Sequence, residues 1–267
     1  MTSELPGKNK PNYGIDAPNV VRNLIICGAI GFILWLSTVF NLWSGNVVIR
    51  PGASVELDFP MGIIGIIWAI GFTSTAIWMV WSSKIGKIKQ REKLLQNFSW
   101  KGNEMVLDVG CGRGLMLIGA AKRLSTGKAV GIDIWHTEDL SGNKMEATLE
   151  NCRIENVEER TEIKTADMRQ LPFADAIFDI VLSCTAIHNL HNASDRNKAI
   201  SEIARVLKPG GQALIDDIRF HNEYASNFTA NGCKDVKRVS SPIVDFLATL
   251  ITFGSLRPAT IMVKKGI

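Results

Sequence analysis

A glycine-rich turn between an apolar run and a helical stretch is the first part of this sequence that is suited to chemistry. The turn reads Val106-Leu107-Asp108-Val109-Gly110-Cys111-Gly112-Arg113-Gly114, with Leu at position 115. Glycines let a ligand approach the backbone closely, and the start of a helix offers free N–H groups to an anionic group. A nicotinamide dinucleotide site favours a third glycine one position later. The spacing therefore predicts a small-ligand site of another kind.

Two further carboxylates follow apolar runs downstream of this turn. Asp133 ends the run 129–133, and a carboxylate at the tip of a second strand can accept hydrogen bonds from both ribose hydroxyls. Asp167, with Met168 beside it, lies just beyond a third run, where it can accept a hydrogen bond from an adenine amino group. The apolar run 178–184 would end at the same cleft. Together these segments predict a nucleotide-type ligand site.

The elements that must position these residues are short apolar runs that alternate with helical stretches from Met105 onward. This alternation is typical of βαβ units and a mostly parallel sheet. The expected strands are Met105–Val109, Ala129–Ile134, Thr161–Thr165, Phe178–Cys184, Gln212–Asp217, Lys234–Val239 and Thr260–Val263. The expected helices are Leu115–Ser125, Lys144–Asn156, Asp195–Leu207 and Asn222–Ala230. The sequence Pro209-Gly210-Gly211 indicates the turn into the fifth strand.

The five segments occur in the order found in a known enzyme family, and the fifth is 204–211, Ala-Arg-Val-Leu-Lys-Pro-Gly-Gly. Over about residues 93–263 the chain resembles class I S-adenosylmethionine-dependent methyltransferases of the small-molecule and lipid type. The resemblance implies an α/β, Rossmann-like domain of seven strands and S-adenosyl-L-methionine as cofactor. It also implies that the last two strands, joined by 240–259, form the family's reversed hairpin.

The same resemblance implies a role for each part of the predicted cofactor site. Asp108 and the glycine loop 110–114 would hold the methionine part of the cofactor. Asp133 would hold the ribose, with Ile134 beside the adenine, and residues 167–168 would hold the adenine edge. Residues 183–188 would line the methyl-transfer site. The predicted cofactor-binding residues are Asp108, Gly110, Cys111, Gly112, Gly114, Asp133, Ile134, Asp167, Met168 and Ser183.

The chain departs from the family in two places. The fourth strand is followed by Ser183-Cys184-Thr185-Ala186, where amide and nucleobase N-methyltransferases carry an Asn-Pro-Pro-Tyr type tetrad. This departure disfavours methylation of those nitrogens. In addition, the N-terminal helices that usually cover the substrate are missing, because residues 84–100 run directly into the first strand.

Several other polar side chains near the predicted cleft allow a functional and a structural interpretation. His188 is the candidate catalytic residue, because an imidazole titrates near working pH and can take a proton from a thiol, hydroxyl or phenol. The alternative is a capping or cleft-lining histidine, and His191 is a weaker candidate. Asp216 and Asp217, which end the fifth strand, would face the substrate or a cation, or accept hydrogen bonds from a neighbouring loop. The loop with His136, Asp139 and 141–143 would shape the pocket, or precede a helix capped by Ser141 or Asn143.

Cysteine chemistry and a metal site are not predicted. The five cysteines (27, 111, 152, 184 and 233) have no CxxC spacing, and no Cys/His cluster has zinc-ligand spacing. An odd number of scattered cysteines also disfavours a disulfide framework. Cys111 and Cys184 are interpreted as small packing residues close to the cofactor, because nothing near them in the sequence lowers a thiol pKa.

Two stretches free of charged residues precede the methyltransferase-like part. They lie between Arg22 and Arg50 and between Asp58 and Lys84, and each is long enough to cross a bilayer. They predict a transmembrane hairpin over 23–83, with spans at about 23–43 and 60–82. Glycines 28, 31, 62, 65 and 71 would let the two helices pack closely. The alternatives are a signal peptide for the first stretch and a buried core hairpin for both.

The distribution of charge predicts the orientation of this hairpin and excludes one class of partner. The chain has a net charge of +4, but residues 84–101 hold six basic and one acidic side chain, or +5. A basic excess confined to one short stretch disfavours a general nucleic-acid surface. The positive-inside rule then places both termini and the catalytic domain in the cytoplasm, with membrane lipids beside the basic run. The predicted domains are 1–22, the hairpin 23–83, a basic linker helix 84–100 and the methyltransferase domain 101–267.

The sequence therefore predicts an integral membrane S-adenosylmethionine-dependent methyltransferase with an amphiphilic or apolar small-molecule acceptor. A lipid headgroup amine, a quinone or phenol, and an alkyl thiol all fit. Ile243–Leu256 is too short to span and would lean on the bilayer or pack on the sheet. Because every expected cofactor contact follows residue 107, a chain starting near Lys84 should keep its cofactor affinity. A catalytically inactive membrane scaffold and a nicotinamide-dependent oxidoreductase are the alternatives from other classes.

Overall fold

A computed structural model describes residues 10–52, 55–239 and 257–267 of the chain, which divides into two compact units. The larger unit contains the described parts of Met1–Tyr13, Ile88–Thr137 and Gly142–Ile267. The smaller unit contains the described parts of Gly14–Lys87 together with Glu138–Ser141.

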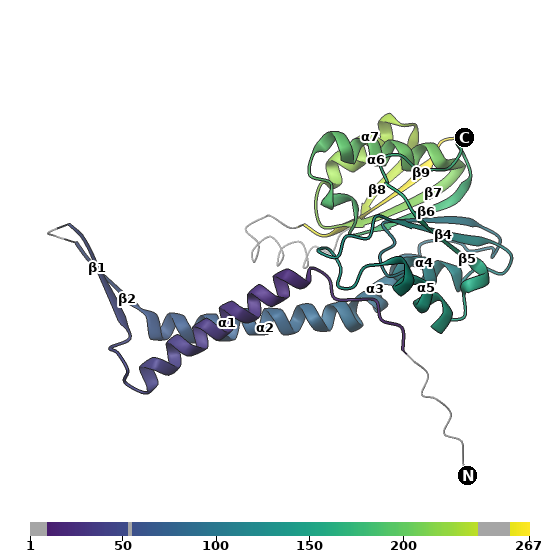
Figure 1. The fold of residues 1–267 in the computed structure, drawn as a ribbon. Coiled ribbons are helices and arrows are strands. Elements are labelled where there is room, and N and C mark those ends of the chain that lie inside the picture. The colour runs from purple at the N-terminus through teal and green to yellow at the C-terminus, as the bar shows by residue number, and fades with distance from the viewer. Residues whose placement is uncertain (1–9, 53–54, 240–256) are drawn as a thin grey trace, which may run out of the picture. The chain divides into compact units, whose positions relative to one another are not determined.

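The larger unit is built on a seven-stranded sheet with the order β5-β4-β3-β6-β7-β9-β8 (Figure 1). Neighbouring strands from β5 to β7 run parallel, and β9 is antiparallel to both β7 and β8. The strands are β3 (Met105–Val109), β4 (Lys128–Asp133), β5 (Thr161–Thr165), β6 (Phe178–Cys184), β7 (Leu207–Asp217), β8 (Cys233–Val239) and β9 (Ala259–Lys265). The order and the reversed last hairpin confirm the α/β methyltransferase fold with a mostly parallel sheet.

Helices cover both faces of this sheet (Figure 1). They are α3 (Lys87–Leu95), α4 (Leu115–Ala121), α5 (Met145–Ile154), α6 (Ala193–Val206) and α7 (His221–Ala230), with 3-10 turns η2 (Glu158–Arg160) and η3 (Ile187–Asn189). Two buried apolar clusters result, one against α6 and α7 and one against α3, α4 and α5. Leu107 and Val106 on β3 belong to different clusters, as the two-residue period of a strand requires.

The predicted strands and helices agree with the structure to within a few residues, except at the start of β7. That strand begins at Leu207, which pairs with Phe178, and its register shifts before Ile180 pairs with Gln212. Gly210 has φ +76° inside this irregular stretch. The predicted turn at Pro209-Gly210-Gly211 is therefore a distortion within a longer strand.

The structure divides the predicted linker 84–100 between the two units. Residues from Ile88 onward belong to the larger unit, because Leu94, Leu95 and Phe98 are buried in the cluster beneath α4. The described N-terminal residues up to Tyr13 also belong to that unit, and Tyr13 is only 6% exposed. The part of this segment from Ile88 to β3 is thus part of the folded domain.

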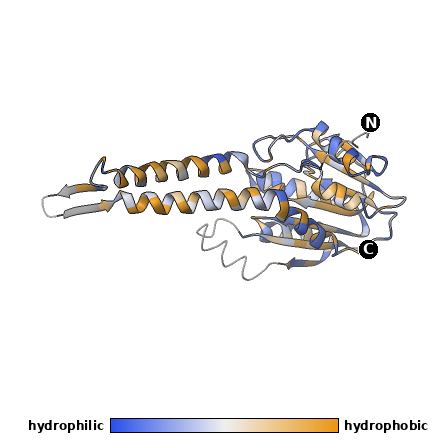
Figure 2. Ribbon diagram, turned by 90° about the horizontal axis from the view of Figure 1, so that it is seen from below, coloured by the Kyte–Doolittle hydropathy of each residue, from blue (hydrophilic) through white to orange (hydrophobic). Residues whose placement is uncertain are grey.

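The smaller unit is a pair of apolar helices, α1 (Pro18–Val39) and α2 (Met61–Trp81), joined by a two-stranded antiparallel ribbon. The ribbon consists of β1 (Asn46–Gly52) and β2 (Val55–Pro60), and α2 is followed by the short π-helix η1 (Ser82–Gly86). Figure 2 shows apolar residues along both helices. Both are long and apolar enough to cross a membrane, and only 17% of the most apolar stretch of each is buried within the structure. This observation weakly suggests the predicted spans.

Glycines allow the close approach of α1 and α2 within this unit. A Cβ built on Gly31 would lie 2.6 Å from the carbonyl oxygen of Gly65, and one on Gly65 would lie 2.7 Å from that of Gly31. A Cβ on Gly28 would meet Thr73 at 2.5 Å. Gly71, which we also expected at this contact, faces away from the helix pair, because a Cβ built on it would have no atom within 4 Å.

Polar contacts hold the ends of the smaller unit together. The Asp16 carboxylate accepts a hydrogen bond from Ser83 Oγ at 3.1 Å and forms an ion pair with Lys87 at 3.0 Å. The backbones of Asp16 and Leu140 also form an isolated antiparallel β-bridge. The Ile15 N–H donates to Ser141 Oγ at 2.7 Å. Ser141 therefore binds the segment before α1 and does not cap α5, whose N-cap residue is Lys144.

Candidate functional site

The glycine loop connects β3 to α4 with three glycines in the left-handed region of φ. Gly110, Gly112 and Gly114 have φ values of +73°, +51° and +83°, which residues with a Cβ adopt at a cost. A Cβ on Gly110 would lie 2.3 Å from that of Ala186, in the loop after β6. The first glycine is therefore required both by its conformation and by the close approach of a second loop. This contact brings the segment that carries His188 to the cofactor loop.

Asp108 is buried at the end of β3, directly before this loop. Its carboxylate accepts a hydrogen bond from the Leu117 N–H at 2.8 Å, and the residue is 1% exposed. Burial raises the pKa of Asp108 to about 7, and the negative charge of Asp133 adds to this effect. A buried carboxylate of this kind favours a cation nearby, because a positive charge stabilises the ionised form.

Asp133, at the end of β4, ties the second strand to the glycine loop. Its Oδ2 accepts from the Gly112 N–H at 2.8 Å, and its Oδ1 accepts from the Trp135 N–H at 2.6 Å. Asn143 Nδ2 also donates to Oδ1, at 3.2 Å. Asn143 thus supports Asp133 and does not cap α5. A carboxylate has about four acceptor positions, so further donors can still be accommodated.

Helix α5 holds two carbonyl groups of the glycine loop. Thr148 Oγ1 donates to the Gly112 carbonyl at 2.7 Å, and Asn151 Nδ2 donates to the Arg113 carbonyl at 2.9 Å. Glycine peptides rotate easily, so these bonds restrict which way the loop's peptide groups point. The conformation of the loop is therefore set by side chains outside the loop itself.

The residues predicted at the adenine edge differ in how they are engaged. Ile134 is 44% exposed, as a side chain beside a ligand would be. Met168 is half-buried, and its Cε lies 3.7 Å from a Cβ built on Gly110. The Asp167 carboxylate forms an ion pair with Arg169 at 2.6 Å, and this guanidinium holds the pKa of Asp167 below its usual range. Arg169 also pairs with Asp195 at 2.8 Å. The Arg169 guanidinium therefore already occupies part of the hydrogen-bonding capacity of the Asp167 carboxylate.

Ser183 and the two nearby cysteines lie beneath the predicted site. Ser183 is buried and donates to the Val109 carbonyl at 2.9 Å, so its hydroxyl joins β6 to the start of the glycine loop. Burial raises the pKa values of the Cys111 and Cys184 thiols well above their ordinary range. A thiol with a raised pKa is a weak nucleophile, which supports a packing role for both cysteines.

His188 lies beside a buried carboxylate at the end of β7. Its Nδ1 is 2.6 Å from Asp217 Oδ1, and the Asp217 side chain is 1% exposed. The angles of this contact are outside the hydrogen-bonding range, and Nδ1 has no hydrogen-bond partner in the described part of the chain. At this distance, a rotation of the ring that aligned an Nδ1–H with the carboxylate would complete the hydrogen bond. Nε2 would then be the basic nitrogen of the ring.

Further contacts fix Asp217 and the histidine loop. Asp217 Oδ2 accepts from the His188 N–H at 3.1 Å and from the Tyr224 hydroxyl at 3.2 Å. Arg196 is 5% exposed, donates to the carbonyls of Leu190 and His191, and pairs with Glu223 at 2.8 Å. The loop that carries His188 is therefore held from both β7 and α6.

Asp216 has a different environment from its neighbour. Its two oxygens accept hydrogen bonds at 2.6 Å, one from Thr260 Oγ1 and one from Gln90 Nε2 on α3. Burial raises the pKa of Asp216, and these two donors act in the opposite direction. These two donors account for the position of the Asp216 carboxylate without a ligand, which agrees with the interpretation of Asp216 as a structural residue.

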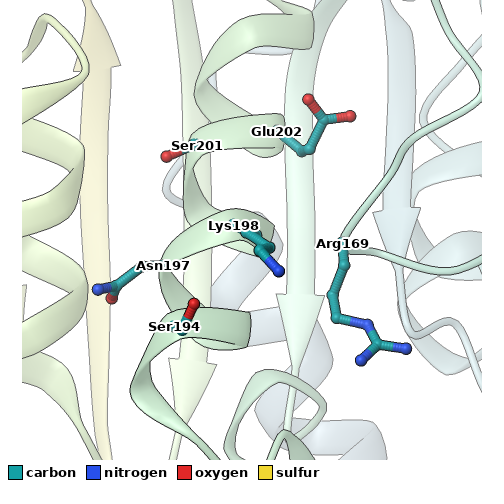
Figure 3. A pocket seen from close by; sticks show the side chains of 6 residues that line it. All are labelled: Arg169, Ser194, Asn197, Lys198, Ser201 and Glu202. Atoms are coloured by element: carbon teal, nitrogen blue, oxygen red, sulfur yellow. The ribbon is translucent and has the colours of Figure 1, made fainter.

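A shallow hollow lies on the face of α6, and no residue of the glycine loop lines it (Figure 3). It is lined by Arg169, Ser194, Asn197, Lys198, Ser201 and Glu202. None of these is a predicted site residue. No group of three His, Cys, Asp or Glu side chains suited to a metal ion occurs among the residues that the structure describes. The predicted segment Ile243–Leu256 lies outside these residues.

Sequence reasoning missed the partners that position the site. Asp217 was expected only as a substrate or loop contact, and no role was predicted for Tyr224, Asn151 or Gln90. Gln90 and Asp216 are 126 positions apart, and no local pattern links them. The sequence signal that could have indicated the contact of Asp217 with His188 is that both lie at or just beyond the ends of predicted parallel strands, which meet at the same edge of the sheet.

Comparison with known proteins identifies the central segment. Residues 107–215 match the model of a family described as "Methyltransferase domain". A sterol 4-C-methyltransferase of Caenorhabditis elegans is 33% identical over 122 residues, which are 46% of this chain and 33% of that protein. A chloroplastic 2-phytyl-1,4-beta-naphthoquinone methyltransferase of Arabidopsis thaliana is 35% identical over 134 residues, or 49% of each chain. The matched segment thus spans half or less of these curated relatives.

A solved structure has the same fold. Geranyl diphosphate C-methyltransferase of Streptomyces coelicolor, crystallised with S-adenosyl-L-homocysteine, superposes with a TM-score of 0.53 at 15% sequence identity. The alignment covers 66% of this chain and 75% of that one. The sequence comparisons confirm the predicted enzyme class, an S-adenosylmethionine-dependent methyltransferase domain, and the solved structure shows the same fold.

Proposed function

We propose that this protein is an integral membrane methyltransferase that transfers a methyl group from S-adenosyl-L-methionine to an apolar or amphiphilic acceptor carrying an acidic proton. The observation that carries the acceptor chemistry is the contact between His188 and the buried Asp217. The contact of Ala186 with Gly110 brings this pair close to the glycine loop. Phenols, quinols, hydroxyls and thiols are acceptors of this kind.

The described residues fit the cofactor. Asp108 and Asp133 bring two carboxylates to the glycine loop, which suits a ligand with cationic sulfonium and ammonium groups. Asp133 would hold the ribose, and Met168 with Ile134 would contact the adenine. When bound, the cofactor supplies a methyl group already activated by the sulfonium, with S-adenosyl-L-homocysteine as the leaving group when the S–CH3 bond breaks. The protein's task is then mainly to align the acceptor with it.

His188 and Asp217 supply the proton transfer. With Nδ1–H directed at Asp217, the Nε2 lone pair is free to take the proton of the acceptor as its oxygen or sulfur attacks the methyl carbon. The carboxylate of Asp217 stabilises the resulting imidazolium. Tyr224 and the His188 N–H keep that carboxylate in place. An acceptor that has no proton to lose would not need this pair.

The apolar character of the acceptor is inferred from the two helices and from the relatives. Two helices of spanning length and a run of basic residues after them support a membrane anchor with both termini and the catalytic domain in the cytoplasm. The named activities of two relatives, on a sterol and on a phytylated naphthoquinone, support a lipophilic acceptor. An anchored domain would meet such a molecule at the membrane surface.

Product analysis tests this function. The purified full chain is incubated with cofactor carrying a ¹³C methyl group and with extracted membrane lipids, including reduced quinones. The chemical shift of the transferred carbon then distinguishes methyl on oxygen, sulfur, nitrogen and carbon. We expect an O- or S-methyl product, and His188→Gln should lower kcat by about 10²–10⁴-fold with cofactor affinity retained. A C- or N-methyl product formed equally well by His188→Gln would contradict the proposed chemistry.

A further inference from the structure

The short segment that precedes α1 is an integral part of the larger unit. The Tyr13 hydroxyl donates to Glu155 Oε1 at 3.0 Å, and the Arg91 guanidinium lies 5.8 Å from the centre of its ring. Burial raises the pKa of this hydroxyl, so it stays protonated as a donor. The side chain packs in the same apolar cluster as Leu95 and Leu117. We call Asn12–Tyr13 the N-terminal strap.

One buried side chain connects the strap to the glycine loop. Asn151 on α5 is 2% exposed. Its Oδ1 accepts from the Asn12 N–H, and its Nδ2 donates to the carbonyls of Asn12 and Arg113, each at 2.9 Å. A primary amide has two donor hydrogens, so the strap and the loop together use both of them. The two partners are therefore held by one rigid group.

We propose that Asn151 is a positioning residue through which the N-terminal strap sets the conformation of the cofactor loop. Arg113 lies between two glycines with positive φ, Gly112 and Gly114, so its peptide carbonyl is easily rotated unless it is held. The strap fixes the Asn151 amide from the opposite side, at two atoms. Cofactor affinity thus depends on a segment that contacts no cofactor and lies about 100 positions before the loop. This inference rests on the proposed role of the loop in cofactor binding.

The consequence reverses one expectation from the sequence. A chain starting near Lys84 retains every predicted cofactor contact but lacks the strap, so Asn151 Oδ1 loses its donor and Nδ2 keeps only the Arg113 carbonyl as acceptor. An unsatisfied buried polar group is costly, and the loop would relax to reduce that cost. We therefore expect such a chain to bind the cofactor more weakly than the full chain does.

The test measures the affinity for S-adenosyl-L-methionine by calorimetry on the full chain in detergent micelles. The variants are Asn151→Leu, a chain lacking residues 1–13, and the combination of the two. Each single change should weaken binding by about 5–30-fold. The combination should be no weaker than the worse single change, because both break the same link. The KM for the cofactor should rise by a larger factor than kcat falls.

A chain lacking only residues 1–9 is the matched control, because it retains the strap and removes one Lys and one Glu, with no change in net charge. It should bind as the full chain does. Wild-type affinity in the chain lacking 1–13, or additive losses in the combination, would overturn the proposal. If Asn151→Leu does not fold, the two truncations decide alone. Failure of the full chain itself to bind the cofactor would instead refute the proposed function.

Discussion

Asp108 combines deep burial with a carboxylate neighbour, and this gives the protein a pH-dependent stability. Its pKa is about 7 in the folded chain against 3.8 for an unperturbed group, so the folded state binds this proton more tightly. The stabilisation is fully present below pH 3.8 and is lost as the pH rises through 7. Asp108→Asn should therefore flatten the slope of unfolding free energy against pH between about 4 and 7.

Urea unfolding at about pH 5 and about pH 8, on either side of the raised pKa, measures this effect. The amide of Asp108→Asn can still accept from the Leu117 N–H, so the fold is retained. The variant should be the more stable protein at the higher pH, by no more than about 1.4 kcal/mol for each pKa unit of the shift. Identical pH slopes in the two proteins would mean that Asp108 titrates normally.

Asp133 is the residue on which cofactor affinity should depend most directly. Asp133→Ala removes the expected ribose acceptor and the acceptor of the Gly112 N–H. Loss of charge-assisted hydrogen bonds costs on the order of 1.5–3 kcal/mol, or about 10–150-fold in affinity. Calorimetry with S-adenosyl-L-methionine measures it, and an unchanged affinity would remove Asp133 from the site. Asp133→Asn, which keeps one oxygen, should lie between the two proteins.

At the scale of elements, the crossing of α1 and α2 depends on particular glycines. Gly65→Val would place methyl groups against the backbone of α1, where even a Cβ lies 2.7 Å from the Gly31 carbonyl oxygen. Gly71→Val adds the same atoms to the same helix with nothing within 4 Å of the Cβ. Only Gly65→Val should lower the midpoint of thermal unfolding of the helix pair in micelles, and overpacking typically costs about 1–3 kcal/mol. Equal midpoints for the two variants would contradict the observed packing.

The strands and helices of the larger unit could be predicted because their local signals agree with their environment. The core strands β3 and β6 are buried on both faces, so they appear in the sequence as continuous apolar runs. The role of α3 could not be predicted in this way, since its residues 87–95 are mostly polar and resemble a solvated basic linker. Its burial depends on Leu94 and Leu95 meeting a cluster formed by distant parts of the chain.

The candidate site was likewise predictable where its residues are close in sequence and not where they come from distant segments. The glycine loop, Asp108 and Asp133 are local to strand ends, and the structure brings them together. Asn151 and Asn12 are 139 positions apart, and His188 and Asp217 belong to different strand–loop junctions. The first pair is created by packing of the N-terminal strap on α5 and the second by the neighbouring positions of β6 and β7 in the sheet, and the sequence displays neither locally. Arg169, by contrast, is two positions from Asp167, so their pairing could have been predicted from the sequence.

At the scale of the whole molecule, the proposed topology places residues between the spans and residues of the domain on opposite sides of the membrane. Gly52→Cys introduces a thiol between the two apolar helices, and Lys198→Cys introduces one on the exposed face of α6. In sealed vesicles with the cytoplasmic face outward, a membrane-impermeant maleimide should add label at position 198 only, beyond the labelling that the five native cysteines give in the unsubstituted chain. After the vesicles are opened, both should react. Labelling at position 52 in intact vesicles would reverse or exclude the proposed topology.

The most direct measurement of the central claim is the transfer of a labelled methyl group in reconstituted vesicles that contain membrane lipid extract. Labelled S-adenosyl-L-methionine is supplied in the surrounding water, and the initial rate at which label enters the organic-extractable fraction is recorded. The full chain should transfer label at a steady rate, and Asp133→Ala should transfer at least about tenfold less at a limiting cofactor concentration. Cofactor binding without transfer of label to any lipid-phase molecule would contradict methylation of an apolar acceptor by this protein.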